Sequence, residues 1–125
     1  MNVRVDAIDD HVRSRTWRWT AITGVALLVL VTIHMVAHHF VVEAIGGLRS
    51  YGDVIEYISN PVIFVLEAIF LVVVTIHAML GIRSVLFDLG LGASRRRMVD
   101  RSLLGLGILT IAYGFVLIGV LASRG

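Results

Sequence analysis

Four histidines lie inside long apolar runs of the chain. His77 lies in VVVTIHAMLGIRSVLFDLG, and His34, His38 and His39 lie in VTIHMVAHHF. A polar side chain inside a membrane is costly, and it usually faces a cavity, a partner or a cofactor. A neutral imidazole can ligate haem iron, or it can form a structural hydrogen bond between two helices. The spacing of the residues leaves both roles open.

His77 has the most informative surroundings. Gly81 follows it by four residues and therefore lies on the same face of a helix. A flat macrocycle bound to His77 needs a small neighbour, and Gly81 is one. Further along, Arg83 could hold a haem propionate or polarise a quinone carbonyl through a charge-assisted hydrogen bond, and Asp88 could hold that arginine or carry protons. Both residues also fit a plainer role, as a snorkelling arginine and an acidic residue at a helix end.

The histidines of the first apolar run lie at a different depth. His34 and His38 share one helix face, and His39 points about 100° away. At the helical rise per residue, His34 lies about 22 Å and His77 about 15 Å from the same membrane edge. We therefore expect separate sites at two levels, with His34 and His38 as candidate ligands of a second haem. Glu67 lies near the level of His34. It could hydrogen-bond to His34 or His38, serve a proton path, or simply be an acidic residue at the membrane interface.

The composition predicts the kind of elements that position these residues. The chain has 125 residues, of which 58% are apolar and 16% are charged, and its mean hydropathy is +0.90. Soluble domains carry about 25% charged residues, so the composition argues against a water-soluble globule. The absence of cysteine excludes disulfides, thiolate metal sites and covalently attached haem. We predict an all-α integral membrane protein.

Three transmembrane helices are predicted, at about residues 19–42, 62–87 and 102–122. Residues 1–18 form a polar, amphipathic lead, and residues 19–125 form the membrane domain. Pro61 should open the second helix, a short interfacial helix should cover residues 51–58, and residues 88–101 should form a loop. Small residues on the third helix favour close helix contacts; they are Gly105, Gly107, Gly114 and Gly119.

Arginine placement predicts the orientation. The basic residues are all arginine, and they flank the apolar runs, which is typical of membrane topology rather than of nucleic-acid binding. The amino-terminal segment and the second loop hold most of them, so both should be cytoplasmic and the carboxyl terminus outside. These arginines are Arg4, Arg13, Arg15, Arg18, Arg95, Arg96, Arg97 and Arg101, against Arg49 and Arg124 on the other side.

The arrangement His77, Gly81, Arg83 and Asp88 in HAMLGIRSVLFDLG resembles the second-helix signature of succinate dehydrogenase membrane anchor subunits. The topology and the segment IHMVAHHF match the small hydrophobic, cytochrome b556-type subunit, over about residues 17–90. The resemblance implies a non-catalytic subunit of succinate:quinone oxidoreductase (complex II) in a prokaryotic plasma membrane. Its partners would be a second anchor chain, an iron–sulfur subunit and a flavoprotein, with no nucleic acid.

The resemblance also assigns roles to residues. It implies that His77 is an axial ligand of haem b, with the other ligand supplied by the second anchor chain, and that Gly81, Arg83 and Asp88 lie in the region of the quinone and the propionates. The quinone would be menaquinone or ubiquinone. Leu89 stands where single-haem members have a quinone-binding tyrosine. The histidines of the first helix are similar to those of two-haem anchors, which implies a second haem on His34, with His38 as the other candidate.

Two other functions fit the same residues. An independent b-type di-haem cytochrome would need two histidine pairs at matched depths within one chain. A non-redox three-helix membrane protein would use the histidines for packing or proton relay. Haem in the complex, together with a co-purifying flavoprotein, distinguishes the anchor subunit from both.

Overall fold

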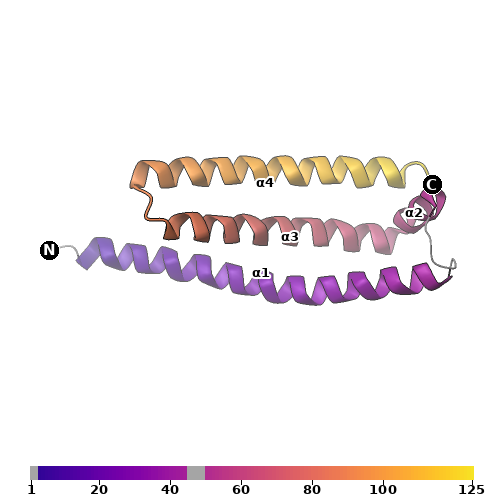
Figure 1. Cartoon of the computed structure of the whole chain (residues 1–125), viewed down its shortest axis with the longest axis horizontal. Coiled ribbons are helices and arrows are strands. Elements are labelled where there is room, and N and C mark those ends of the chain that lie inside the picture. The colour runs from indigo at the N-terminus through magenta and orange to yellow at the C-terminus, as the bar shows by residue number, and fades with distance from the viewer. Residues whose placement is uncertain (1–2, 45–49) are drawn as a thin grey trace.

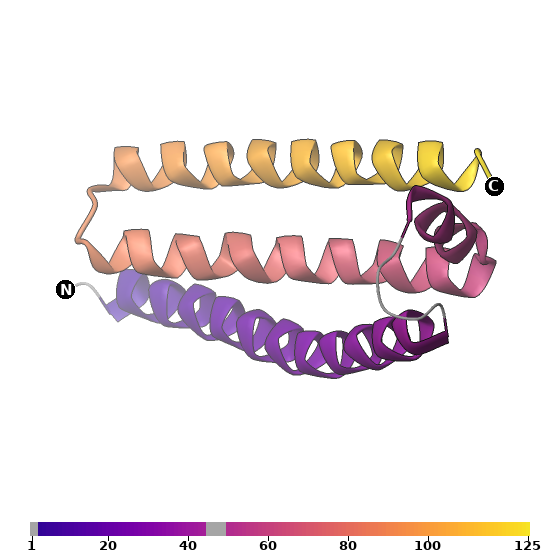
Figure 2. The ribbon, with the colours of Figure 1, turned by 45° about the vertical axis from the view of Figure 1, so that its right-hand side comes forward.

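The computed structural model describes residues 3–44 and 50–125, and within them the chain is entirely helical. Helix α1 spans Val3–Ala44, α2 spans Tyr51–Ser59, α3 spans Pro61–Asp88 and α4 spans Ala93–Ala122. The three long helices run side by side, with α3 between α1 and α4, and α2 lies across one end (Figures 1 and 2). The amino terminus and the α3–α4 turn lie at the opposite end from α2 and the carboxyl terminus (Figure 1).

Three of these helices are long and apolar enough to cross a membrane, as predicted. The qualifying stretches are residues 15–40, 61–88 and 93–122. The amphipathic lead is not a separate element, because its described residues continue into the first span as one helix, α1. Its position at a membrane surface stays a prediction.

The starts of α2 and α3 follow from local sequence. Ser50 and Asp53 form a capping box at the start of α2, in which each side chain satisfies a free backbone N–H of the other. Asn60 Oδ1 accepts from Val62 N at 2.9 Å, and Pro61 occupies the first turn of α3. A proline fits there because its missing N–H would have no helical partner. The short helix predicted over residues 51–58 is confirmed.

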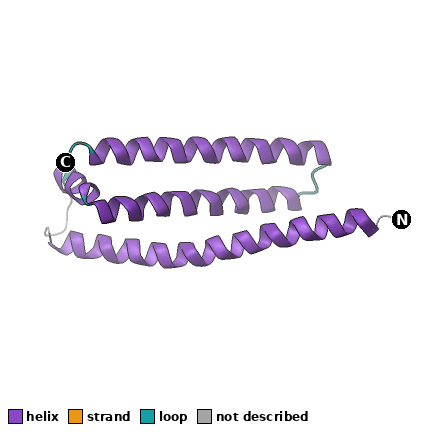
Figure 3. Ribbon diagram, turned by 180° about the vertical axis from the view of Figure 1, so that it is seen from behind, coloured by secondary structure: helices purple, strands orange, loops and turns teal. Residues whose placement is uncertain are grey.

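The loop before α4 is shorter than predicted. Residues 93–101 were expected to be loop, and this is wrong, because α4 already begins at Ala93. Only residues 89–92 connect the two helices (Figure 3). Gly90 has a φ of 72°, a conformation that glycine adopts without steric cost, and it allows the turn. Arginine and methionine are good helix formers, so the helix extends beyond the apolar run that defined the prediction.

Helices α3 and α4 approach closely at two glycines. A Cβ atom added to Gly114 would meet Leu71 Cδ2 at 2.5 Å, and one added to Gly107 would meet Met79 Cγ at 3.3 Å. Gly105 and Gly119 have no such neighbour within 4 Å. Two of the four glycines predicted to pack closely therefore do so within this chain.

Most of the molecular surface is apolar and exposed. Among the residues whose burial is described, the buried ones are few: Thr23, Tyr57, Ile58, Thr75 and Gly107. Large apolar side chains such as Leu28, Val62 and Leu109 are each at least two-thirds exposed. A surface of this kind is suited to lipid and to other transmembrane helices.

Candidate functional site

His77 faces α1 and is held there by a threonine. Its Nδ1 lies 3.2 Å from Oγ1 of Thr23, a residue only 7% exposed. The Thr23 hydroxyl donates its proton to the Trp19 carbonyl at 2.7 Å, so its oxygen is left to accept from His77. The proton of the imidazole is therefore on Nδ1, and the lone pair is on Nε2. Gly24 permits this approach, because a Cβ there would lie 3.3 Å from His77 Cε1.

The free nitrogen of His77 and the space beside it fit a haem. Nε2 has no hydrogen-bond partner among the described residues and is not a buried atom. One turn further, a Cβ on Gly81 would meet nothing within 4 Å. A neutral imidazole with a fixed tautomer is the usual form of a histidine that ligates a metal. Gly81 provides the open space that the sequence predicts beside His77.

Arg83 lies at the α3–α4 end of the molecule and is paired with a carboxylate on α4. Its Nε donates to Asp100 Oδ1 at 2.6 Å. Its guanidinium lies 4.2 Å from the centre of the Phe87 ring, and the Arg96 guanidinium lies 5.1 Å from the same centre. These contacts tie the end of α3 to the start of α4. They also present a cluster of positive charge beside the turn.

Asp88 ends α3 next to this cluster. Asp88 does not hold Arg83, as had been one alternative, because Asp100 does so. The Asp88 side chain is exposed and has no partner among the described residues. Leu89, the next residue, is 71% exposed and has no group that can donate a hydrogen bond.

His34, His38 and Glu67 come together where α1 packs against α3. Glu67 Oε1 lies 3.0 Å from His34 Nδ1 and 3.6 Å from His38 Nε2. The two imidazole rings are 4.2 Å apart, and His34 stacks on Phe70 at 5.0 Å. Tyr57 of α2 donates its hydroxyl to Glu67 Oε1 at 3.4 Å. Glu67 therefore contacts both candidate histidines, while His39 is exposed.

The two histidine sites are at different levels, as predicted. His77 lies beside Thr23 and Gly24 of α1, and His34 lies eleven residues further along that helix. Eleven residues of α-helix correspond to about 16 Å. This separation is larger than the difference of about 7 Å expected from sequence, and it keeps the two sites independent within the chain.

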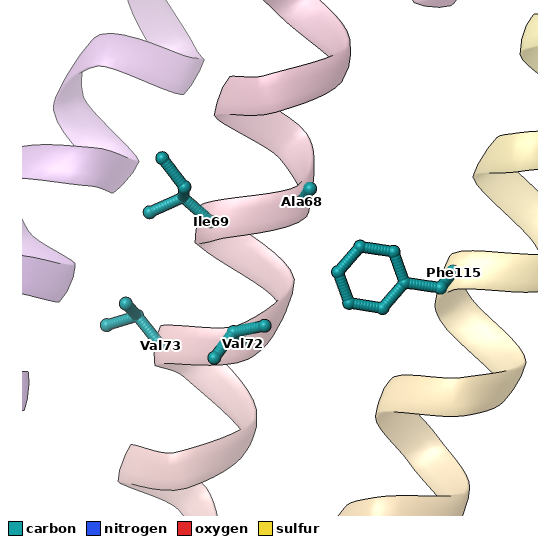
Figure 4. Close-up of a pocket in the computed structure, with 5 residues that line it drawn as sticks. All are labelled: Ala68, Ile69, Val72, Val73 and Phe115. Carbon is teal, nitrogen blue, oxygen red and sulfur yellow. The ribbon is translucent and has the colours of Figure 1, made fainter.

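A shallow apolar hollow lies between α3 and α4. It has a volume of about 230 Å³ and is lined by Ala68, Ile69, Val72, Val73 and Phe115 (Figure 4). None of these side chains can hydrogen-bond to a quinone carbonyl. The hollow can accept an apolar side chain or a lipid tail, but it cannot orient a polar headgroup.

Three residues of these sites were not identified from the sequence: Thr23, Asp100 and Tyr57. Thr23 lies in an apolar run, where threonine commonly bonds to its own helix. Asp100 lies in residues 88–101, where the sequence predicts a loop. Tyr57 lies in the short helix that the sequence predicts before Pro61. No sequence pattern indicates its contact with Glu67.

Comparison with known proteins identifies the family. The model of the succinate dehydrogenase/fumarate reductase transmembrane subunit matches residues 4–121. A succinate dehydrogenase hydrophobic membrane anchor subunit of Archaeoglobus fulgidus is 28% identical over 93% of this chain and 97% of its own. A protein of the same name from Thermoplasma acidophilum is 25% identical over 78% of this chain and 77% of its own. No solved structure gives a significant match. The chain therefore belongs to the family of succinate dehydrogenase/fumarate reductase transmembrane subunits.

Proposed function

We propose that this chain is the hydrophobic membrane anchor subunit of a succinate:quinone oxidoreductase and helps to pass electrons from an iron–sulfur subunit to quinone. The observation that carries the proposal is His77, whose Nδ1 is bonded to Thr23 and whose Nε2 has no partner among the described residues. Family membership and the three membrane-spanning helices support the same role. The chain has no cysteine, so iron–sulfur clusters must be held by a partner.

The haem is assigned to the surface of α3 around His77 and Gly81. Nε2 of His77 would hold the iron, and the open space at Gly81 would take the edge of the macrocycle. The second axial ligand would come from a second anchor chain, because the other described histidines inside the spans lie about 16 Å or more away along α1. A bound b-type haem supplies a one-electron carrier.

The quinone is assigned to the α3–α4 end of the molecule. Asp88, which has no partner in the described part of the chain, would offer a carboxylate for proton exchange, and the arginines around Phe87 would offer positive charge to a reduced headgroup. Arg83 keeps its Nε on Asp100, so its other nitrogen atoms would make the contact. Menaquinone and ubiquinone both carry carbonyls that such donors can bind.

The partners and the orientation complete the proposal. A second anchor chain would cover part of the exposed apolar surface, and an iron–sulfur subunit with its flavoprotein would dock at the arginine-rich end. This end would be cytoplasmic in a prokaryotic plasma membrane, because positively charged flanks remain inside. The exposed arginines Arg95 and Arg97 at the start of α4 are available at that end.

The haem content of the purified complex tests the proposal. His77→Ala should remove or greatly weaken a haem in the reduced-minus-oxidised spectrum while the complex still assembles. His39→Ala is the matched control, since His39 is an exposed histidine in another span, and it should leave the spectrum unchanged. A His77→Ala complex with the parent's haem content would overturn the ligand assignment. A parent without haem and without a co-purifying flavoprotein would overturn the anchor role.

The number of haems per chain decides the role of His34. Two haems would assign the second to His34 or His38, as the resemblance to two-haem anchors implies. One haem would assign neither histidine to a haem, and their role would then be structural.

A further inference from the structure

The contacts of His34 repeat those of His77 with a different acceptor. We propose that Glu67 is the positioning residue for a second haem held by His34: its carboxylate accepts the Nδ1 proton of His34 and leaves Nε2 to the iron. This inference rests on the proposed anchor function and deepens it. It selects one of the two candidate histidines, and it gives a role to an acidic residue inside a membrane span.

The orientation of the His34 ring depends on its Nδ1. This atom is buried and makes no hydrogen bond within the described part of the chain, while Glu67 Oε1 lies 3.0 Å from it. That distance is the ordinary length of an N–H···O hydrogen bond, so a small rotation of either side chain would align the bond. A buried N–H without an acceptor is unfavourable, and Glu67 offers the acceptor.

The other nitrogen of His34 is open. Nε2 is not a buried atom and has no hydrogen-bond partner among the described residues, and the side chain is 23% exposed. His77 shows the same division, with Nδ1 3.2 Å from Thr23 Oγ1 and Nε2 without a described partner. In each case the acceptor belongs to the facing helix, which is α1 for His77 and α3 for His34. Both histidines therefore present Nε2 in the way that suits a haem ligand.

His38 lies differently against the same carboxylate. Its Nε2, and not its Nδ1, is the nitrogen near Glu67 Oε1, at 3.6 Å. The remaining nitrogen, Nδ1, is next to the Cβ atom and the helix backbone, where a flat macrocycle has the least room. The Tyr57 ring also lies 4.9 Å from the His38 ring. These contacts favour His34 over His38 as the ligand.

Neighbouring aromatic residues hold the His34–Glu67 pair in place. The Tyr57 hydroxyl donates to Glu67 Oε1 at 3.4 Å, and Phe70 stacks on the His34 ring at an angle of 19°. The Glu67 side chain is only 14% exposed, so water competes little for its oxygen atoms. Both members of the pair lie inside candidate membrane spans, where an unpartnered polar group is costly. The carboxylate is therefore kept beside Nδ1.

The kind of acceptor determines how strongly an imidazole donates to iron. A hydrogen bond from Nδ1–H to a carboxylate is charge-assisted, and it makes the imidazole more basic than a bond to a neutral hydroxyl does. A more basic ligand stabilises ferric over ferrous iron and so lowers the midpoint potential, which is sensitive to such outer hydrogen bonds. Glu67 should therefore set the potential of the haem on His34 and leave that of the haem on His77 to Thr23.

Redox titration of the purified complex, with haem quantified per copy of this chain, tests the role of Glu67. Glu67→Gln keeps the side-chain shape and removes the charge, so the second haem should stay bound and its midpoint potential should rise. A tenfold larger loss of affinity for the ferric than for the ferrous state corresponds to a rise of about 59 mV. Glu67→Leu also removes the acceptor and should weaken binding of this haem by about 10- to 100-fold.

Glu56→Gln is the matched control. It removes the same charge from an exposed residue of α2, at the same end of the molecule (Figure 1). It should leave both potentials at the parent's values. In all three variants the haem on His77 should keep its content and potential.

Three results would overturn the inference. The first is a parent complex with a single haem that is lost in His77→Ala. The second is a two-haem parent that keeps both haems in His34→Ala. The third is a midpoint potential in Glu67→Gln that rises no more than in Glu56→Gln. In each of these cases the haem on His77 and the co-purifying flavoprotein would still report the anchor role, so failure of this inference is distinguished from failure of the proposed function.

Discussion

Thr23 acts on His77 only as a hydrogen-bond acceptor, because its proton is committed to the Trp19 carbonyl. The threonine therefore does two things to the imidazole. It fixes the proton on Nδ1, and it holds the ring against α1 so that Nε2 contacts no described hydrogen-bonding group. An oxygen that accepts from Nδ1–H also makes Nε2 a better ligand. Thr23 is in this sense a positioning residue for the proposed haem.

Replacement of Thr23 tests this role. Thr23→Val keeps the side-chain shape but removes the hydrogen-bond acceptor of His77. We expect haem affinity to fall by about 10- to 100-fold, as is typical when a hydrogen bond to a metal-binding histidine is removed. The midpoint potential of the haem should also shift. Thr23→Ser keeps the hydroxyl and should restore both. Haem retention during dilution and a redox titration of the complex measure the two quantities. A valine variant with the parent's affinity and potential would show that Thr23 only packs.

The sequence identified most of these residues by type, but it identified few of their partners. His77, His34 and Glu67 are recognisable because polar groups are rare in apolar runs. The pairing of Arg83 with Asp100 instead of Asp88 depends on how α4 is rotated against α3. Rotation is set by packing contacts between helices, and hydropathy carries no information about them.

At the level of helices, the sequence predicts that three membrane spans exist and in which order they follow. It does not predict where α1 and α4 begin. Hydropathy shows where an apolar run stops, but a helix continues as long as its residues tolerate helical geometry. Helix α4 therefore begins at Ala93, before its apolar run, and α1 includes the polar lead. Pro61 and Gly90 are different, because proline fixes its own φ at the start of α3 and glycine permits the positive φ found at residue 90.

The contact between α3 and α4 should depend on Gly114. A side chain there would overlap Leu71, whose Cδ2, Cδ1 and Cγ would all lie within 3.3 Å of a new Cβ. Overpacking of this kind costs about 1–3 kcal/mol, so Gly114→Leu should lower the unfolding temperature of the chain in detergent. Gly119→Leu is the matched control, because a Cβ there meets nothing within 4 Å. Equal stability of the two variants would mean that α4 does not pack on α3 through Gly114.

The whole molecule is a single layer of three long helices whose faces are largely uncovered (Figure 2). Such a layer has no enclosed core, so lipid and other subunits must supply the remaining contacts. Charge is distributed along its long axis. The arginines at the start of α4 lie at the same end as the start of α1. Arg124 lies at the other end, where its Nη1 donates to the Tyr51 hydroxyl.

This distribution makes the orientation testable with single cysteines, since the chain has none of its own. Ser94→Cys places a thiol at the exposed start of α4, and Ser123→Cys places one at its exposed end. If the arginine-rich end is cytoplasmic, a membrane-impermeant maleimide should label Ser123→Cys in intact cells and Ser94→Cys in inverted vesicles. Labelling of both in detergent confirms that each thiol is reactive. The reverse pattern would place Asp88 and the arginines around Phe87 outside the cell, away from a cytoplasmic iron–sulfur subunit, and the proposed route of electrons through this end would then fail.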